Sequence, residues 1–149
     1  TTVIGKKSSA SLAKIAGKKL SGKKTYKVRI KAYTLVNGNK VYIGGSQDYH
    51  IAGKNSTRYT NVKKISVSRQ TVFLKKGRST KIKAVIKKQS SKKKLLPESH
   101  GKALRYYTTA ENIATVTPQG MIQAKKKGTC YVYVTALNGV RTKVKVTVK

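Results

Sequence analysis

Apolar and polar residues alternate along several short stretches of this chain. Over residues 26–33 the apolar positions are Tyr26, Val28, Ile30 and Ala32, and the polar positions are Lys27, Arg29 and Lys31. The same alternation returns over residues 81–87 and 142–149. A period of two is typical of β-strands with one buried face. In the two later stretches we expect these side chains to point into a core: Ile82, Ala84, Ile86, Val144, Val146 and Val148.

Turn sequences separate the predicted strands. Asn37-Gly38-Asn39 joins two apolar runs, and Asn138-Gly139 joins the strand ending at Ala136 to the last one, so both sites predict hairpins. Further turns are expected at Gly77, Gly120 and Gly128. No clear amphipathic helix is found. Many short strands joined by turns indicate an all-β sandwich or barrel.

The chain divides into two segments. The first covers residues 1–60, and the second covers residues 66–149, with residues 61–65 expected as the linker. A loop at residues 89–102 interrupts the second segment and carries a dense basic run, Lys92 to Lys94.

Three consecutive motifs in the second segment have a recognisable order. They are Tyr-Thr-Thr-Ala-Glu-Asn-Ile-Ala-Thr-Val (107–116), Thr-Pro-Gln-Gly-Met-Ile-Gln-Ala (117–124) and Lys-Lys-Lys-Gly-Thr-Cys-Tyr-Val-Tyr-Val (125–134). This order resembles the group 2 bacterial immunoglobulin-like domain, with Gly120 and Gly128 matching its turn glycines. Tyr107 departs from the pattern, since Trp is common there. The resemblance implies a Greek-key immunoglobulin-like β-sandwich over about residues 66–149.

The first segment is similar to the closing half of a fibronectin type III domain. Residues 20–26, Leu-Ser-Gly-Lys-Lys-Thr-Tyr, match its tyrosine-corner turn, and the Asn-Gly-Asn hairpin with Gly44-Gly45-Ser46 resembles its last strands. The segment is shorter than the usual sandwich of about 100 residues. The resemblance therefore implies a second, incomplete β-sandwich, which is either a domain cut short or a reduced version of the fold.

Positive charge dominates the composition. Thirty-five basic residues, of which 29 are Lys and six are Arg, face three carboxylates, and the net charge is +32. Specific readout of bases or phosphates favours the planar fork of Arg. The excess of Lys therefore indicates a diffuse field that attracts polyanions. The alternative is that Lys only fills solvated strand faces.

The basic residues fall into rows and clusters that define a candidate polyanion surface. A strand row contains Lys27, Arg29 and Lys31. A loop group contains Lys87, Lys88, Lys92, Lys93 and Lys94. A turn group contains Lys125, Lys126 and Lys127. Further rows are Lys81 with Lys83, and Lys143 with Lys145. We predict that these residues contact an anionic cell-wall polymer or a host glycan, with affinity that falls steeply with salt.

Residues suited to catalysis or metal binding are scarce. Glu98 and His100 share a Lys-rich loop, which is poorly suited to holding an acid–base geometry. Metal sites usually need three or four His, Cys, Asp or Glu ligands, and here these residues are scattered. Cys130, the sole cysteine, lies in an apolar strand and is expected in the core. The sequence predicts no enzyme, no cofactor and no metal, and no apolar run reaches the length of about 18 residues that a membrane span needs.

These observations predict a non-catalytic stalk or adhesion module of a secreted or cell-surface bacterial protein, beside other domains of the same polypeptide. One alternative is a carbohydrate-binding accessory domain of a secreted enzyme, with stacking rings from Tyr106, Tyr107, Tyr131 and Tyr133. Either Tyr131 and Tyr133 or the alternate residues Cys130, Val132 and Val134 face the core, and an outward Tyr pair favours sugar binding. The other alternative is nucleic-acid binding, which the scarcity of Arg and the absence of a recognition helix oppose.

Overall fold

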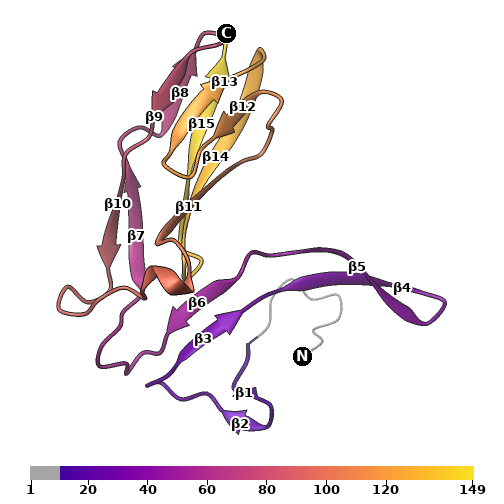
Figure 1. Cartoon of the computed structure of the whole chain (residues 1–149), viewed down its shortest axis with the longest axis vertical. Coiled ribbons are helices and arrows are strands. Elements are labelled where there is room, and N and C mark those ends of the chain that lie inside the picture. Colours follow the sequence, from indigo (N-terminus) through magenta and orange to yellow (C-terminus); the bar gives the residue numbers. More distant parts are fainter. Residues whose placement is uncertain (1–10) are drawn as a thin grey trace.

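The computed structural model describes residues 11–149, and over this range the chain is all-β with one short 3-10 helix, η1 (Glu98–His100) (Figure 1). The strands before residue 60 are β1 (Lys14–Ile15), β2 (Lys18–Lys19), β3 (Thr25–Val28), β4 (Lys31–Val36), β5 (Asn39–Gly45) and β6 (Tyr49–Ala52). The later strands are β7 (Val62–Val67), β8 (Thr71–Leu74), β9 (Ser79–Lys81), β10 (Ala84–Lys88), β11 (Leu104–Thr108), β12 (Ala114–Val116), β13 (Met121–Ala124), β14 (Gly128–Ala136) and β15 (Arg141–Val148).

The C-terminal part is a two-layered sandwich. One layer is a four-stranded sheet in the order β11–β14–β15–β8, and the other contains β12–β13–β9. The β8–β15 pair is parallel, whereas its neighbours in the sheet are antiparallel. Strands β7 and β10 form a separate antiparallel pair that lies below β8 and β9 (Figure 1), and β7 packs against β14 of the four-stranded sheet.

The core lies between these layers and follows the predicted alternation. Val144, Val146 and Val148 are at most 2% exposed, so the inward face predicted for residues 142–149 is confirmed. They pack with Ile122 of the facing sheet and with Cys130, which is buried as predicted. The hairpin turn predicted at Asn138-Gly139 joins β14 to β15, which places both strands in the same sheet.

A break within one alternating stretch places its two halves in different sheets. The stretch at residues 81–87 breaks after β9, which pairs with β13, and continues as β10, which pairs with β7. Ile82, at the break, is 2% exposed. Residues 62–65, expected within the linker, belong to β7 and place Val62 and Ile65 in a second apolar cluster with Val134.

Residues 11–60 form three two-stranded sheets, β1–β2, β3–β6 and β4–β5. The continuous strand expected over residues 26–33 is instead split between β3 and β4, and Ile30 in the gap is 57% exposed. No second sheet covers this stretch among the described residues, so its apolar positions stay in contact with solvent. The hairpin at residues 37–39 is confirmed, with Asn37 and Gly38 at φ of 51° and 78°, the left-handed values of a type I′ turn.

The hydroxyl of Tyr26 closes a turn at the start of β3. It accepts a hydrogen bond from the Ser21 amide (2.6 Å) and donates one to the Ser21 carbonyl (3.1 Å). A tyrosine hydroxyl that returns to the backbone a few residues upstream is the contact of a tyrosine corner. Residues 20–26 therefore have the hydrogen bonds of a tyrosine corner, and the fibronectin type III resemblance stays a prediction.

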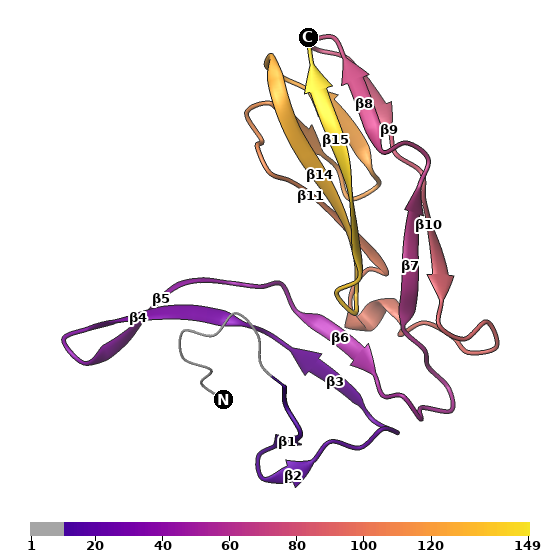
Figure 2. The ribbon, with the colours of Figure 1, turned by 180° about the vertical axis from the view of Figure 1, so that it is seen from behind.

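Strand β6 joins the N-terminal part to the foot of the sandwich (Figure 2). The His50 amide donates to the carbonyl of Leu137, at 2.9 Å. The side chain of Asn61 holds both backbone groups of Ala52, accepting from its N–H (2.9 Å) and donating to its carbonyl (2.7 Å). The junction is therefore fixed by directed hydrogen bonds rather than by a large apolar contact.

The interrupting loop completes this junction. The amide of Thr60 donates to the carbonyl of Lys94 (2.8 Å), and the amide of Lys94 donates to the carbonyl of Arg58 (3.1 Å). Leu96 of the same loop is buried. The loop thus binds the chain segment that links β6 to β7.

Candidate functional site

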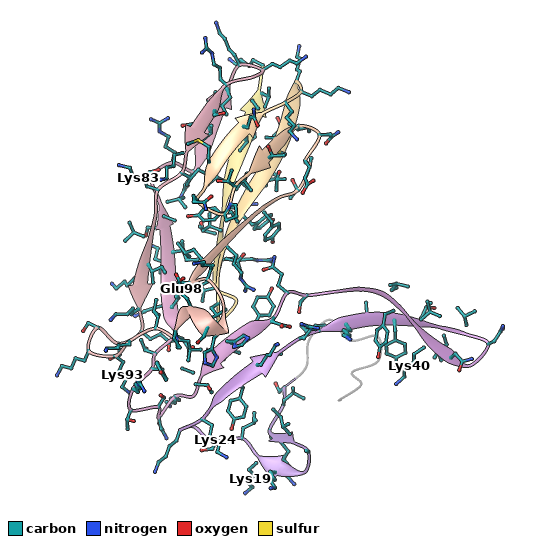
Figure 3. The ribbon with its side chains drawn as sticks, in the orientation of Figure 1. Lys19, Lys24, Lys40, Lys83, Lys93 and Glu98 are labelled. Atoms are coloured by element: carbon teal, nitrogen blue, oxygen red, sulfur yellow. The ribbon has the colours of Figure 1, made fainter. Side chains whose placement is uncertain are left out.

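The loop group of predicted polyanion ligands contains two lysines that serve the fold. Lys88 donates through its ammonium to the carbonyls of Ser91 (2.9 Å) and Lys93 (2.7 Å). The ammonium of Lys93 donates to the carbonyl of Ser56 (Figure 3). Both side chains are half-buried, whereas Lys87, Lys92 and Lys94 are exposed. Only this exposed subset is available to a polymer without breaking loop contacts.

The strand row at residues 27–31 is partly neutralised. Arg29 and Lys27 both contact the carboxylate of Asp48, with Arg29 Nη2 and Lys27 Nζ at 2.7 and 2.8 Å from Oδ2. The hydrogen bond from Arg29, and then that from Lys27, hold the pKa of Asp48 well below its usual range. The hydrogen bond to Asp48 in turn raises the pKa of Arg29. The ammonium of Lys31 lies 4.8 Å from the ring centre of Tyr42. Two of the three predicted ligands thus already hold an anion.

The turn group, Lys125 to Lys127, is exposed between β13 and β14. Since Gly128 pairs with Val148, this turn lies at the end of the sandwich that carries the C-terminus, opposite the interrupting loop (Figure 1). The structure therefore does not bring the predicted groups together into one site. Labelled lysines in Figure 3 extend from Lys40 on the β4–β5 hairpin to Lys83 beside the sandwich.

The tyrosines of β14 face outward. Cys130, Val132 and Val134 are buried at 2, 0 and 0% exposure, so Tyr131 and Tyr133 lie on the opposite, outer side of the sheet. Tyr107 of β11 stacks on Tyr133, with ring centres 5.0 Å apart and planes 8° apart. The alternative left open by the sequence is thus settled in favour of the outward Tyr pair.

Tyr106 is the exception among the four candidate rings. It pairs with Val134 across the sheet and packs against the second apolar cluster on the inner side. Burial raises the pKa of its hydroxyl. Tyr106 is therefore a core residue and not a stacking platform for a ligand.

Cations from β15 cover the outward rings. The guanidinium of Arg141 lies 5.4 Å from the ring centre of Tyr133, and the ammonium of Lys143 lies 4.8 Å from that of Tyr131. Such contacts hold a cation in place by the negative face of the ring. We call this surface the tyrosine–lysine face, defined by the outward side chains Tyr107, Tyr131, Tyr133, Arg141, Lys143 and Lys145.

The sheet that carries this face contains no acidic residue. The sequences of β8, β11, β14 and β15 contain neither Asp nor Glu. Asp48 is paired in the N-terminal part, Glu98 of η1 pairs with Lys102, and Glu111 lies in the turn before β12. Sequence reasoning found Lys143 and Lys145 but missed Arg141, although Arg141 continues the same alternation by one step.

The described residues offer little to a metal or to acid–base chemistry. Residues 11–149 contain no cluster of three or more His, Cys, Asp or Glu side chains. His50 and His100 approach with their Nδ1 atoms 3.1 Å apart. Burial first, and then the charge of His100, lowers the pKa of His50. None of the helices in this part of the chain has the length and apolar character to span a bilayer.

Comparison with known families identifies the sandwich. A family model described as bacterial Ig-like domain (group 2) matches residues 61–148, which is more than half of the chain. The chain belongs to this family. The group 2 Ig-like resemblance is thereby confirmed, and the Ig-like domain begins at the residues that form β7 rather than after them.

Two of the solved structures that match this chain are of the S-layer protein SbsC. Domains 4 and 5 of the S-layer protein SbsC are 16% identical, with 68% of this chain and 58% of that chain covered and a TM-score of 0.48. A longer structure of the same protein, rSbsC(31-844), is 14% identical with a TM-score of 0.48 and covers 91% of this chain. This chain spans only 21% of that longer structure. A search of curated proteins finds no match.

Proposed function

We propose that this chain is a non-catalytic module of a secreted or cell-surface bacterial protein, and that its cationic surface binds anionic cell-wall polymers or host glycans. Membership of the bacterial Ig-like family supports the extracellular setting. The observation that carries the binding proposal is the tyrosine–lysine face, where three cations lie on a sheet without a carboxylate.

The physical basis is electrostatic. A net charge of +32 on 149 residues produces a field that concentrates polyanions near every exposed face. A polyanion that reaches the surface releases condensed counterions, and its affinity then falls linearly with salt on a logarithmic scale. Because the tyrosine–lysine face contains no acidic residue, none of its cations forms an ion pair within the face. Lys27 and Arg29, in contrast, are both paired with Asp48.

Neutral-sugar binding is the second candidate, and the outward tyrosines favour it. Sugar stacking needs an open ring face. Tyr133 has Tyr107 on one side and is contacted by Arg141, and Tyr131 is contacted by Lys143. These contacts leave less ring surface for a sugar or a nucleobase than for an anion that meets the cations directly.

Binding of the whole chain to teichoic acid, heparin, duplex DNA and a neutral polysaccharide tests the proposal. Affinities are measured by calorimetry between about 50 and 300 mM salt, over which phosphate contacts weaken by orders of magnitude. We expect binding to the anionic polymers with a steep negative salt slope, and none to the neutral polysaccharide. Absence of polyanion binding even at the lowest salt would contradict the proposal, and salt-independent binding to the neutral polymer would favour the second candidate.

A further inference from the structure

We propose that β15 binds one particular kind of polyanion, a linear phosphodiester polymer with six bonds between successive phosphates, laid in extended form along the strand. Poly(glycerol phosphate) is such a polymer. The inference rests on the proposed function and narrows it from a diffuse field to a row of cations. The row consists of the outward residues Arg141, Lys143 and Lys145 and the terminal Lys149.

The spacing of the row carries the argument. Alternate residues of an antiparallel strand lie about 6.8 Å apart, twice the rise of about 3.4 Å per residue. An extended polypeptide advances about 3.3–3.6 Å for each residue, that is, for three backbone bonds. A six-bond repeat of similar covalent geometry therefore spans about 7 Å by the same scale. One phosphate of poly(glycerol phosphate) can then face each outward position of β15.

The setting of the row favours a bound chain over isolated ion contacts. β14 pairs with β15 along its whole length, and β8 pairs with it from Lys145 to Val148, so the second half of the row runs along the interior of the sheet. On the β14 side, Tyr131 and Tyr133 hold Lys143 and Arg141, and on the β8 side Phe73 lies 5.5 Å from the Lys149 ammonium. Cations that are already positioned lose less side-chain entropy when a ligand binds.

The same ring contacts argue against single-stranded nucleic acid, whose backbone also has six bonds between phosphates. Proteins that bind single strands without sequence preference use aromatic faces on which bases stack. On the tyrosine–lysine face Tyr133 is covered by Tyr107 and Arg141, and Tyr131 by Lys143. A polymer without bases can pair its phosphates with the cations and does not need free ring faces for stacking.

One position of the row lacks a cation. Thr147 pairs with Thr129 of β14 and stands between Lys145 and Lys149. A phosphate at this step meets a hydroxyl rather than an ammonium. The gap provides a gain-of-function test, because a cation placed there completes a row of five.

Loss of function is tested with a charge-matched pair of variants. The ligand is a short synthetic poly(glycerol phosphate) with one phosphate for each outward position from Arg141 to Lys149, bound to the full chain at about 0.1 M salt, where the Debye length is about 10 Å. We expect Lys143→Gln/Lys145→Gln to weaken binding at least about tenfold. The magnitude of its salt slope should fall by about 1.4, or 0.7 per contact. Lys18→Gln/Lys19→Gln, which removes the same charge from the exposed strand β2 of the N-terminal part (Figure 1), should weaken binding less than about twofold, since screening separates the two places.

Gain of function is tested with Thr147→Lys. It should strengthen binding several-fold and steepen the salt slope by about 0.7. Gln123→Lys adds the same charge on β13 of the opposite layer and should change little. Melting temperatures of all variants establish that each remains folded.

Two further ligands test the spacing and the polymer class. Poly(ribitol phosphate), with longer linkers and the same number of phosphates, should bind more weakly per phosphate and gain less from Thr147→Lys. Single-stranded DNA of equal phosphate number should bind no more tightly than poly(glycerol phosphate). Three outcomes would each contradict the proposal that β15 binds a six-bond phosphodiester polymer, while leaving the proposed function intact. They are tighter binding of DNA, equal binding of both wall polymers, and equal losses of affinity in the two double variants. If the wild-type chain binds no polyanion at low salt, both fail.

Discussion

Residues 26–33 and residues 142–149 carry the same alternation of apolar and basic side chains, but their apolar positions end in opposite environments. In β15, Val144, Val146 and Val148 are almost completely buried. In the N-terminal part the equivalent Ile30 is 57% exposed, and Ile43 of the neighbouring hairpin is 68% exposed. What differs is the layer opposite: β12, β13 and β9 face residues 142–149, and among residues 11–149 no sheet faces residues 26–33.

The comparison separates two properties that sequence patterns tend to merge. Alternation specifies that a segment is extended and has one apolar side. Burial of that side contributes about 1.5–3 kcal/mol for each large aliphatic residue, and it requires a partner surface. The Ig-like domain supplies its own partner surface. The N-terminal ribbons rely on hydrogen bonds at β6 and on the interrupting loop.

The largest expected effect comes from truncating one isoleucine in each region. Ile122→Ala removes a side chain with no exposed surface from the centre of the core and should lower the free energy of unfolding by about 2–5 kcal/mol. Ile43→Ala should change it by less than about 0.5 kcal/mol, because that side chain already contacts solvent. Urea denaturation measures both, and a large loss for Ile43→Ala would mean that a partner surface covers the ribbon in solution.

A smaller effect is expected at the junction, which the two regions share. Asn61→Ala removes both hydrogen bonds to the Ala52 backbone and should destabilise the attachment of β6 by about 1–3 kcal/mol. Hydrogen exchange should accelerate at the β3 and β6 amides and remain slow in β14. Asn112→Ala, at an exposed position, is the matched control. Uniform acceleration through both regions would show that they unfold as one unit.

Much of this fold follows from local sequence signals. The two Asn-Gly turns, the outer and inner sides of β15, and the Ig-like motifs of residues 107–134 predicted the sandwich. The sheet changes at Ile82 and at Ile30 were not predicted, because they depend on which strand lies alongside, and those strands are distant in the sequence. In the same way, nothing near Lys88 or Lys93 indicates that their ammonium groups bind backbone carbonyls.

The arrangement of the cationic surface also could not be predicted from local sequence signals. Composition revealed the charge, but not that aromatic rings would take the place of the missing carboxylates. In residues 11–149 seven rings lie within 5.5 Å of a cation, and these pairs occur in both regions. With three carboxylates available, ring faces attract cations without adding negative charge, as do the backbone carbonyls that hold Lys88 and Lys93. The organised row of β15 arises from this substitution.

A loss of about 1 kcal/mol is expected when the hydroxyl of Tyr26 is removed. Tyr26→Phe deletes its two hydrogen bonds to the Ser21 backbone and keeps the ring. Proteolysis should become faster within residues 20–30 and remain unchanged in the Ig-like domain. Tyr42→Phe serves as the control, since the ring of Tyr42 is 58% exposed on the hairpin. Equal susceptibility of the two variants would indicate that the corner adds no order to the ribbon.

The smallest effect concerns pH, and it acts where the two regions meet. His50 of β6 contacts His100 of η1 through their Nδ1 atoms, an arrangement that requires one of these nitrogens to be unprotonated. The charged groups around His50 are His100, Lys27, Arg105 and Asp48, and only Asp48 favours its protonated form.

Burial and the cationic neighbours lower the pKa of folded His50 below the value of about 6.5 expected in the unfolded chain. As pH falls below about 6.5 the unfolded chain therefore takes up a proton that the folded junction resists, and stability falls until the folded pKa is passed. We expect faster hydrogen exchange in β6 at pH 5.5 than at pH 7.5 after correction for the intrinsic rate. His50→Gln, which keeps the backbone bond to Leu137, should lose most of this dependence. An unchanged pH response in that variant would assign the effect to other groups and leave the junction without a titrating histidine.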